Sequence, residues 1–133
     1  MKTLRLRASR SGVLAFALLL AGSFSGCTSV QVTNDNNTIG EYKLGYLIVQ
    51  PLQTFATVRD ATRKAFKDMG YFLVQDELDV PGSCELRART PNDTTVIVKL
   101  KSFSAYTNVK IRHGLRGELA PEQQLYQAIA RHF

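Results

Sequence analysis

Few residues in this 133-residue chain have types and spacings that suit catalysis or metal binding. The two histidines, His113 and His132, have a spacing that fits no compact metal-binding motif. The acids Asp76, Glu77 and Asp79 lie close together, but the glycine and the terminal glutamate of an EF-hand loop are missing. The chain has neither a nucleophile elbow nor a Walker loop. We therefore expect no enzymatic activity, no metal site and no cofactor.

The two cysteines suggest different roles. Cys84 lies in a segment of alternating polarity, on the side predicted to face the core, where nothing nearby would activate its thiolate. Cys27 instead ends the stretch Leu20–Cys27, in which small residues lead up to the thiol. If Cys27 is chemically modified, Cys84 has no partner for an internal disulfide, and we expect it to be buried.

The segment before Cys27 has the pattern of an export signal. The first ten residues contain four basic residues and no acid. The apolar stretch Val13–Phe24 follows; at about 12 residues, or roughly 18 Å of helix, it is short for a bilayer core of about 30 Å. A basic start, a short apolar stretch and a cysteine after small residues together resemble the lipobox of bacterial lipoproteins, although Phe24 stands where that motif prefers leucine.

The lipobox implies that residues 1–26 are a signal peptide and that Cys27 becomes a lipidated N-terminus, carrying fatty acids such as palmitate. Two alternatives are an uncleaved short anchor and ordinary secretory cleavage that leaves Cys27 as an incidental thiol. Thr28, rather than aspartate, follows the cysteine, which in enterobacterial lipoproteins resembles an outer-membrane signal. We therefore expect a protein of the cell envelope, lipid-anchored in the outer membrane and facing the periplasm, with the membrane as its first partner.

The net charge of the chain is misleading as a guide to its partners. The formal value is +6, from 17 basic and 11 acidic residues. Without the four basic residues of the leader, 13 basic residues face the same 11 acids, which leaves a net charge of +2. We therefore expect no nucleic-acid partner.

The rest of the chain divides into two parts. Residues 27–40 are polar and include the run Asn34–Asn37, so we interpret them as a lipidated N-terminus and a tether. Residues 41–133 suffice for a single small core. In this domain a helix is predicted from the N-cap Thr54 to Gly70, and a second one begins near Pro121. The predicted strands are Tyr42–Gln50, Tyr71–Val74, Ser83–Thr90, Thr94–Lys101 and Thr107–Arg112.

The last three of these strands alternate between apolar and polar residues and are joined by turns, which predicts an antiparallel meander with one wet face. The expected fold is an α+β two-layer sandwich in the order β-α-β-β-β-β-α, with both helices packed on one face of a mostly antiparallel sheet. The apolar side of the last helix should carry Leu125, Ala128, Ile129 and Phe133.

The outward positions of the meander are strongly basic. Like charges on neighbouring strands repel one another, so stability alone would not select this row. It could bind an anionic ligand of the envelope or an acidic protein, or it could only keep the sheet soluble and discourage edge pairing. The candidate binding residues are Arg87, Arg89, Lys99, Lys101, Lys110 and Arg112.

Two segments carry a resemblance to a known family. They are the helical stretch Ala61–Gly70 and the ending Val109–Gly117, which contains a Gly-x-x-Gly before an amphipathic helix. Together with the lipobox, they make the chain similar to an uncharacterised family of small bacterial lipoproteins, in which an aspartate often stands where this chain has Glu118. The resemblance implies a fold but no reaction. We interpret Gly114 and Gly117 as backbone turns rather than a phosphate cradle.

These observations favour a membrane-anchored, non-enzymatic structural or interaction module. The alternative is a binding module whose basic sheet face captures an anionic ligand or an acidic protein. A third class is an accessory subunit of an envelope enzyme or transport complex.

Overall fold

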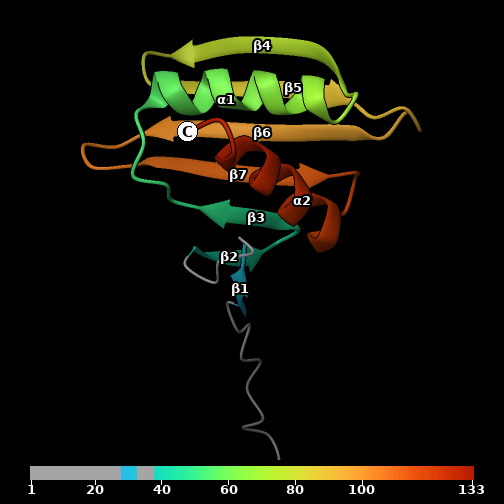
Figure 1. The fold of residues 1–133 in the computed structure, drawn as a ribbon, viewed down its shortest axis with the longest axis horizontal. Helices are drawn as coiled ribbons and strands as arrows, with labels where there is room; N and C mark the ends of the chain where they lie inside the picture. The colour runs from blue at the N-terminus through green and yellow to red at the C-terminus, as the bar shows by residue number, and fades with distance from the viewer. Residues whose placement is uncertain (1–27, 33–37) are drawn as a thin grey trace, which may run out of the picture.

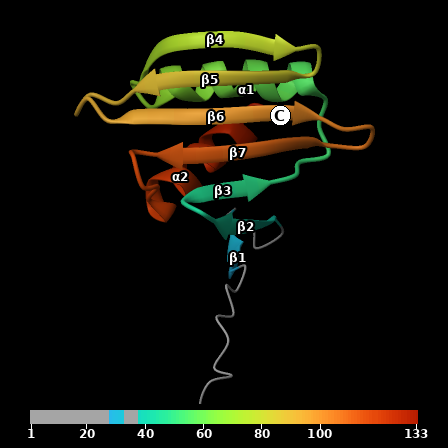
Figure 2. The same ribbon diagram turned by 180° about the vertical axis from the view of Figure 1, so that it is seen from behind.

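The computed structural model describes residues 28–32 and 38–133, which form a seven-stranded sheet with two helices on one of its faces (Figures 1 and 2). The helices are α1 (Phe55–Asp68) and α2 (Leu119–Ala130). The strands are β1 (Thr28–Gln31), β2 (Ile39–Lys43), β3 (Tyr46–Val49), β4 (Phe72–Val80), β5 (Ser83–Arg89), β6 (Thr95–Ser102) and β7 (Thr107–His113).

The strand order is β1-β2-β3-β7-β6-β5-β4, and every neighbouring pair is antiparallel. The α+β two-layer architecture and the meander of β5, β6 and β7 are therefore confirmed. β1 and β4 form the two edges of the sheet and lie at opposite ends of it (Figure 1). The signal peptide and Cys27 lie outside the described residues.

The core lies between the sheet and the helices. The side chains expected to point inward from β5, β6 and β7 are buried, and Cys84 is among them. Burial raises the pKa of the Cys84 thiol to about 11, so it stays protonated at neutral pH. The core residues of these strands are Cys84, Leu86, Ala88, Val96, Val98, Leu100, Val109 and Ile111.

Helix α1 forms as its sequence predicts. The Thr54 side chain caps it by accepting a hydrogen bond from the Thr57 backbone N–H at 3.3 Å, and Gly70 follows it with φ of +70°. Helix α2 begins at Leu119, slightly before the predicted start. Phe133, which was expected on its apolar side, lies beyond the helix and is 41% exposed.

The predicted strand Tyr42–Gln50 is wrong in one respect, because the segment is a hairpin. Leu44 and Gly45 have φ of +53° and +76°, and they join β2 to β3 in a two-residue turn closed by the pair Lys43 and Tyr46. Positive φ at both central positions is typical of a type I′ turn. Leucine is unusual at such a position, so the sequence lacks the turn signal that would have divided the strand.

The tether assigned to residues 27–40 is also wrong where the structure describes it. The segment Thr28–Gln31 is strand β1, paired with β2, and Val32 is fully buried. Gly40 makes room for this packing, since a Cβ atom there would lie 2.7 Å from Val32 Cγ2. A four-residue strand with few large apolar residues cannot be distinguished from a loop by its pattern alone.

Strand β4 is longer than predicted. It begins at Phe72 and continues to Val80, so the acids Asp76, Glu77 and Asp79 lie within the strand. Asp76 points to the helix side, where its carboxylate accepts hydrogen bonds from Arg59 at 3.0 and 2.8 Å and also pairs with Arg63. Two guanidinium groups on α1 thus stabilise a carboxylate that lies beside the core residue Leu86 of β5.

Candidate functional site

No helix or strand of the described residues covers the face of the sheet opposite the helices, and we call it the open face (Figure 2). On β5, β6 and β7 the residues that point to it alternate with the buried core residues. The pairing of the strands brings all six predicted basic residues onto this face, on three adjacent strands. They are Arg87, Arg89, Lys99, Lys101, Lys110 and Arg112. Ligand binding by these residues stays a prediction.

The centre of the open face is a pair of lysines on neighbouring strands. Lys99 of β6 is paired directly with Lys110 of β7, and Lys101 is paired with Asn108. The Cβ atoms of directly paired residues lie about 4.5–5.5 Å apart, so the two lysine side chains start from neighbouring positions on the surface. Such a pair lowers stability unless an anion lies nearby.

The acids on the open face neutralise only part of this charge. Glu85 pairs with Arg87 at 2.5 Å and with Lys99 at 3.7 Å, so one carboxylate serves two cations. Arg89 pairs with Asp93 at 2.6 Å. Within the described part of the chain, the other three basic residues have no carboxylate at ion-pair distance. They are Lys101, Lys110 and Arg112.

Two of these three cations lie over aromatic rings instead. The Arg112 guanidinium is 4.8 Å from the centre of the Tyr46 ring, and Lys101 Nζ is 5.5 Å from that of Phe103. Such contacts are modest at exposed sites, about 0.5–1 kcal/mol, and leave the positive charge in place. The charge of the open face therefore stays available to an external anion.

Two hollows on the open face share Lys99 and Lys110. One of about 220 Å³ is also bordered by Lys101, Ser83 and Asn108 and by the acids Asp79 and Glu85. The Asn108 Oδ1 atom is buried there with no hydrogen-bond partner among the described residues. The other, of about 390 Å³, extends toward the hairpin of β2 and β3 and is also bordered by Glu41, Lys43, Leu44, Tyr46 and Ile48.

Ile97 explains part of the basic row without any ligand. It points to the open face, yet it is only 8% exposed. Its direct cross-strand partners are Arg87 and Arg112, and the aliphatic stems of arginines can cover an apolar side chain while their charged ends stay in water. These two arginines therefore have a packing role as well.

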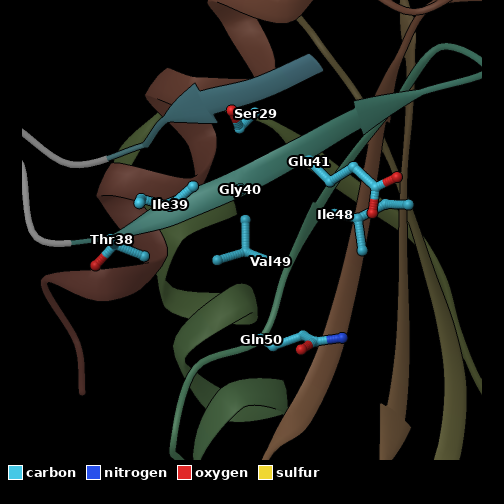
Figure 3. A pocket seen from close by; sticks show the side chains of 8 residues that line it. All are labelled: Ser29, Thr38, Ile39, Gly40, Glu41, Ile48, Val49 and Gln50. Atoms are coloured by element: carbon cyan, nitrogen blue, oxygen red, sulfur yellow. The ribbon is translucent and has the colours of Figure 1, made fainter. Parts of the chain in front are cut away.

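A larger hollow of about 500 Å³ lies along β1, β2 and β3 (Figure 3). Figure 3 shows that the apolar side chains of Ile39, Ile48 and Val49 contribute much of its lining. Glu41 is the one charged residue among those that line it. Among its described lining residues, this hollow has none of the lysines that border the other two.

A buried carboxylate on the helix side was missed by the sequence analysis. Glu122 of α2 is fully buried, and its Oε2 atom accepts a hydrogen bond from the backbone N–H of Leu47 on β3 at 3.1 Å. Its Oε1 atom accepts from the N–H groups of His113 at 2.9 Å and Glu118 at 3.0 Å. Burial raises the pKa of the Glu122 carboxyl, and the three N–H groups oppose that shift.

This carboxylate joins β3, β7 and the start of α2, so its role is structural. Glu122 lies in the first turn of α2, four residues after the acid Glu118. This spacing is only a weak sign that the Glu122 side chain turns back to accept hydrogen bonds from backbone N–H groups at the start of the helix. That sign alone does not identify the groups that the carboxylate binds.

The Gly-x-x-Gly segment packs beside this carboxylate. Gly117 has φ of +85°, and a Cβ atom there would lie 2.0 Å from the carbonyl oxygen of Gly45 in the β2–β3 turn. The reverse contact is as close, since a Cβ atom on Gly45 would lie 2.2 Å from the Arg116 carbonyl oxygen. Because Gly45 and Gly117 have no side chains, the backbone of the β2–β3 turn can contact the backbone of the turn before α2.

The histidines and acids noted in the sequence do not converge. His132 Nε2 lies 2.6 Å from Asp68 Oδ2 and joins the ends of the two helices, whereas His113 lies at the end of β7. Within residues 28–32 and 38–133, no three His, Cys, Asp or Glu side chains are grouped so that they could hold a metal ion. No helix in the same residues has the length and hydropathy needed to cross a bilayer.

Comparison with known proteins identifies a family whose function is unknown. No curated protein matches the chain. A family described as "Protein of unknown function (DUF3568)" matches residues 12–132, a range that includes the apolar stretch, Cys27 and nearly the whole described fold. The chain therefore belongs to the DUF3568 family of proteins of unknown function.

Proposed function

We propose that this protein is an exported bacterial lipoprotein, anchored through Cys27, that serves the cell envelope as a non-enzymatic interaction module. The observation that carries the proposal is the lipobox-like sequence directly before the folded domain. Strand β1 begins at Thr28, the residue after Cys27, so acylation there would hold the β1 edge against the membrane surface. The family match supports the proposal because it includes this stretch.

Acylation at Cys27 is directly testable. In cells fed a labelled fatty acid, the wild-type chain is expected to incorporate the label. Cys27→Ala is expected to incorporate none, because the Cys27 thiol is the group that accepts the first lipid. Cys84→Ala is the matched control and should keep full labelling, since that thiol is buried in the core. Fatty acylation of Cys27→Ala would refute the anchor.

The open face favours a second candidate function, the capture of an anionic envelope ligand or an acidic protein surface. Lys101, Lys110 and Arg112 have no carboxylate partner among the described residues, and Lys99 and Lys110 border two hollows. Three lysines border each hollow, against two acids in one and one acid in the other, and such an excess of positive charge attracts anions. Lys99, Lys101 and Lys110 are the residues that we expect to contact the ligand.

Reversing the charge of this face tests the second candidate. The variant Arg87→Glu/Lys99→Glu/Lys110→Glu is expected to lose at least about tenfold in affinity for anionic vesicles or acidic partners, because attraction becomes repulsion. The measurements are vesicle sedimentation and crosslinking with mass spectrometry in intact cells.

The control for this variant changes net charge equally on the helix side. Lys64, Lys67 and Arg131 are exposed there, and replacing all three by glutamate should leave binding nearly unchanged. Equal losses in both variants would show a non-specific charge effect, and equal retention would show that the open face binds no anion. A crosslinked envelope enzyme or transporter retained by both variants would favour an accessory subunit.

A further inference from the structure

Strand β4 is a long, apolar edge with one side unpaired. It runs for nine residues and, within the described part of the chain, pairs only with β5. Its large apolar side chains are exposed: Phe72 71%, Val74 61%, Leu78 54% and Val80 59%. A long, exposed, apolar edge is a template for pairing with another strand. Figure 1 shows β4 at the end of the sheet remote from β1, so a membrane anchor next to β1 would leave it accessible.

The acids of β4 restrict what can pair with it. Asp76 lies at the middle of the strand and is already bound by two arginines of its own α1, at 2.8 Å for Arg59. Glu77 and Asp79 are exposed and have no ion pair among the described residues. A partner strand must therefore avoid placing acids opposite these two.

We propose that the occupant of this edge is a second copy of the chain, paired antiparallel through its own β4 about a two-fold axis at Asp76. This register places Phe72 opposite Val80 of the second copy and Val74 opposite Leu78 of the second copy. The two free acids then face neutral residues, because Glu77 meets Gln75 and Asp79 meets Leu73. The one acidic pair is Asp76 with itself, where four guanidinium groups surround two carboxylates.

The geometry of β4 suits this symmetry. Phe72 and Val80 both lie on the open face, since they pair with Arg89 and Ser83 of β5. The two register shifts between β4 and β5 lie on either side of Asp76, one between Leu73 and Gln75 and the other between Leu78 and Val80. Directly opposed residues of an antiparallel pair share a face, so the apolar ends of the two copies would meet on the open face.

Neighbouring two-fold registers are less favourable. An axis at Gln75 would place Val74 opposite Asp76 of the second copy. An axis at Glu77 would oppose two unpaired glutamates directly, which is destabilising. Charge and polarity together therefore select the axis at Asp76. This inference goes beyond the proposed function and does not depend on it.

Disulfide trapping tests the register in the purified full-length chain. All variants carry Cys84→Ala. The chain with Cys84→Ala alone is the control, because any disulfide-linked dimer that it forms must involve Cys27. Phe72→Cys and Val80→Cys are made separately in differently tagged copies. Opposed Cα atoms lie about 4.5–5.5 Å apart, within the reach of a disulfide, whereas like residues of the two copies lie about 27 Å apart at 3.4 Å per residue.

The expected result is a covalent dimer only when the two variants are mixed, and none with either variant alone. Single variants that crosslink as well as the mixture would overturn the register. Failure of the mixture to crosslink would overturn pairing with a second copy.

Two lysine variants give an independent measurement. Val74→Lys and Leu78→Lys change exposed side chains, so the fold should be kept while self-association in detergent weakens about tenfold or more, because charge blunts the edge. Leu115→Lys, at an exposed loop position, is the control and should associate like wild type. A monomeric wild type in sedimentation equilibrium would refute the dimer.

Discussion

Gly117→Ala is expected to lower the free energy of unfolding by roughly 3–5 kcal/mol, one of the largest effects of any single methyl group in this protein. The added Cβ would lie 2.0 Å from the carbonyl oxygen of Gly45, and both atoms are held by backbone. The β2–β3 turn would have to separate from the segment before α2. Urea unfolding followed by circular dichroism measures the loss.

Gly70→Ala separates this clash from the cost of the backbone conformation. Gly70 also has a positive φ, +70°, but a Cβ atom there would meet nothing within 4 Å. Its substitution should therefore cost only the left-handed penalty, about 1 kcal/mol. If Gly70→Ala and Gly117→Ala lose the same stability, the close contact of the two turns contributes nothing.

Glu122→Ala is expected to cost about 3 kcal/mol or more, because it leaves three backbone N–H groups without an acceptor in the core. The groups belong to Leu47, His113 and Glu118, so the loss should also weaken the attachment of β3 to α2. Hydrogen exchange of the Leu47 and His113 amides, together with urea unfolding, measures both effects. Unchanged exchange at these two amides would contradict the role given to the carboxylate.

The pH dependence of Glu122→Gln tests the electrostatics of the same site. Burial raises the folded pKa of Glu122 above its ordinary value of 4.5, so the folded state binds the proton more tightly than the unfolded state. Its contribution to stability is then greatest at acid pH and falls as pH rises through the folded pKa. The deficit of Glu122→Gln relative to wild type should shrink over that rise. If the deficit grows with pH instead, the hydrogen bonds from the three N–H groups stabilise the charged carboxylate by more than burial destabilises it.

The parts of the fold that the sequence predicts are those with a strong local period. Helix α1 has a continuous apolar stripe between Thr54 and Gly70, and the strands that carry Leu86, Val98 and Ile111 alternate cleanly. Since alternation also fixes the outer face, the polarity pattern alone is enough to place the six basic residues together. Their ion pairs do not follow from that pattern, because they depend on side-chain positions across strands.

The features that the sequence analysis missed depend on distant partners. Strand β1 is defined by its pairing with β2, and the long β4 is stabilised where Arg59 and Arg63 reach Asp76. Glu122 looks like an ordinary surface acid until Leu47, 75 positions away, supplies an N–H group to it. Local sequence patterns do not predict contacts between distant residues, so these features can be identified only from the tertiary structure.

The placement of β1 and β4 at opposite edges has a mechanical consequence. Six intervals of about 4.8 Å separate the two strands, or roughly 29 Å across the sheet. A pull between the N-terminal strand and a partner held at β4 would act along the interstrand hydrogen bonds, at right angles to the strands. The sheet would then unzip strand by strand rather than shear, and the ladders that join β1, β2, β3 and β7, with three or four residue pairs each, would open before the seven-pair ladders that join β7, β6, β5 and β4.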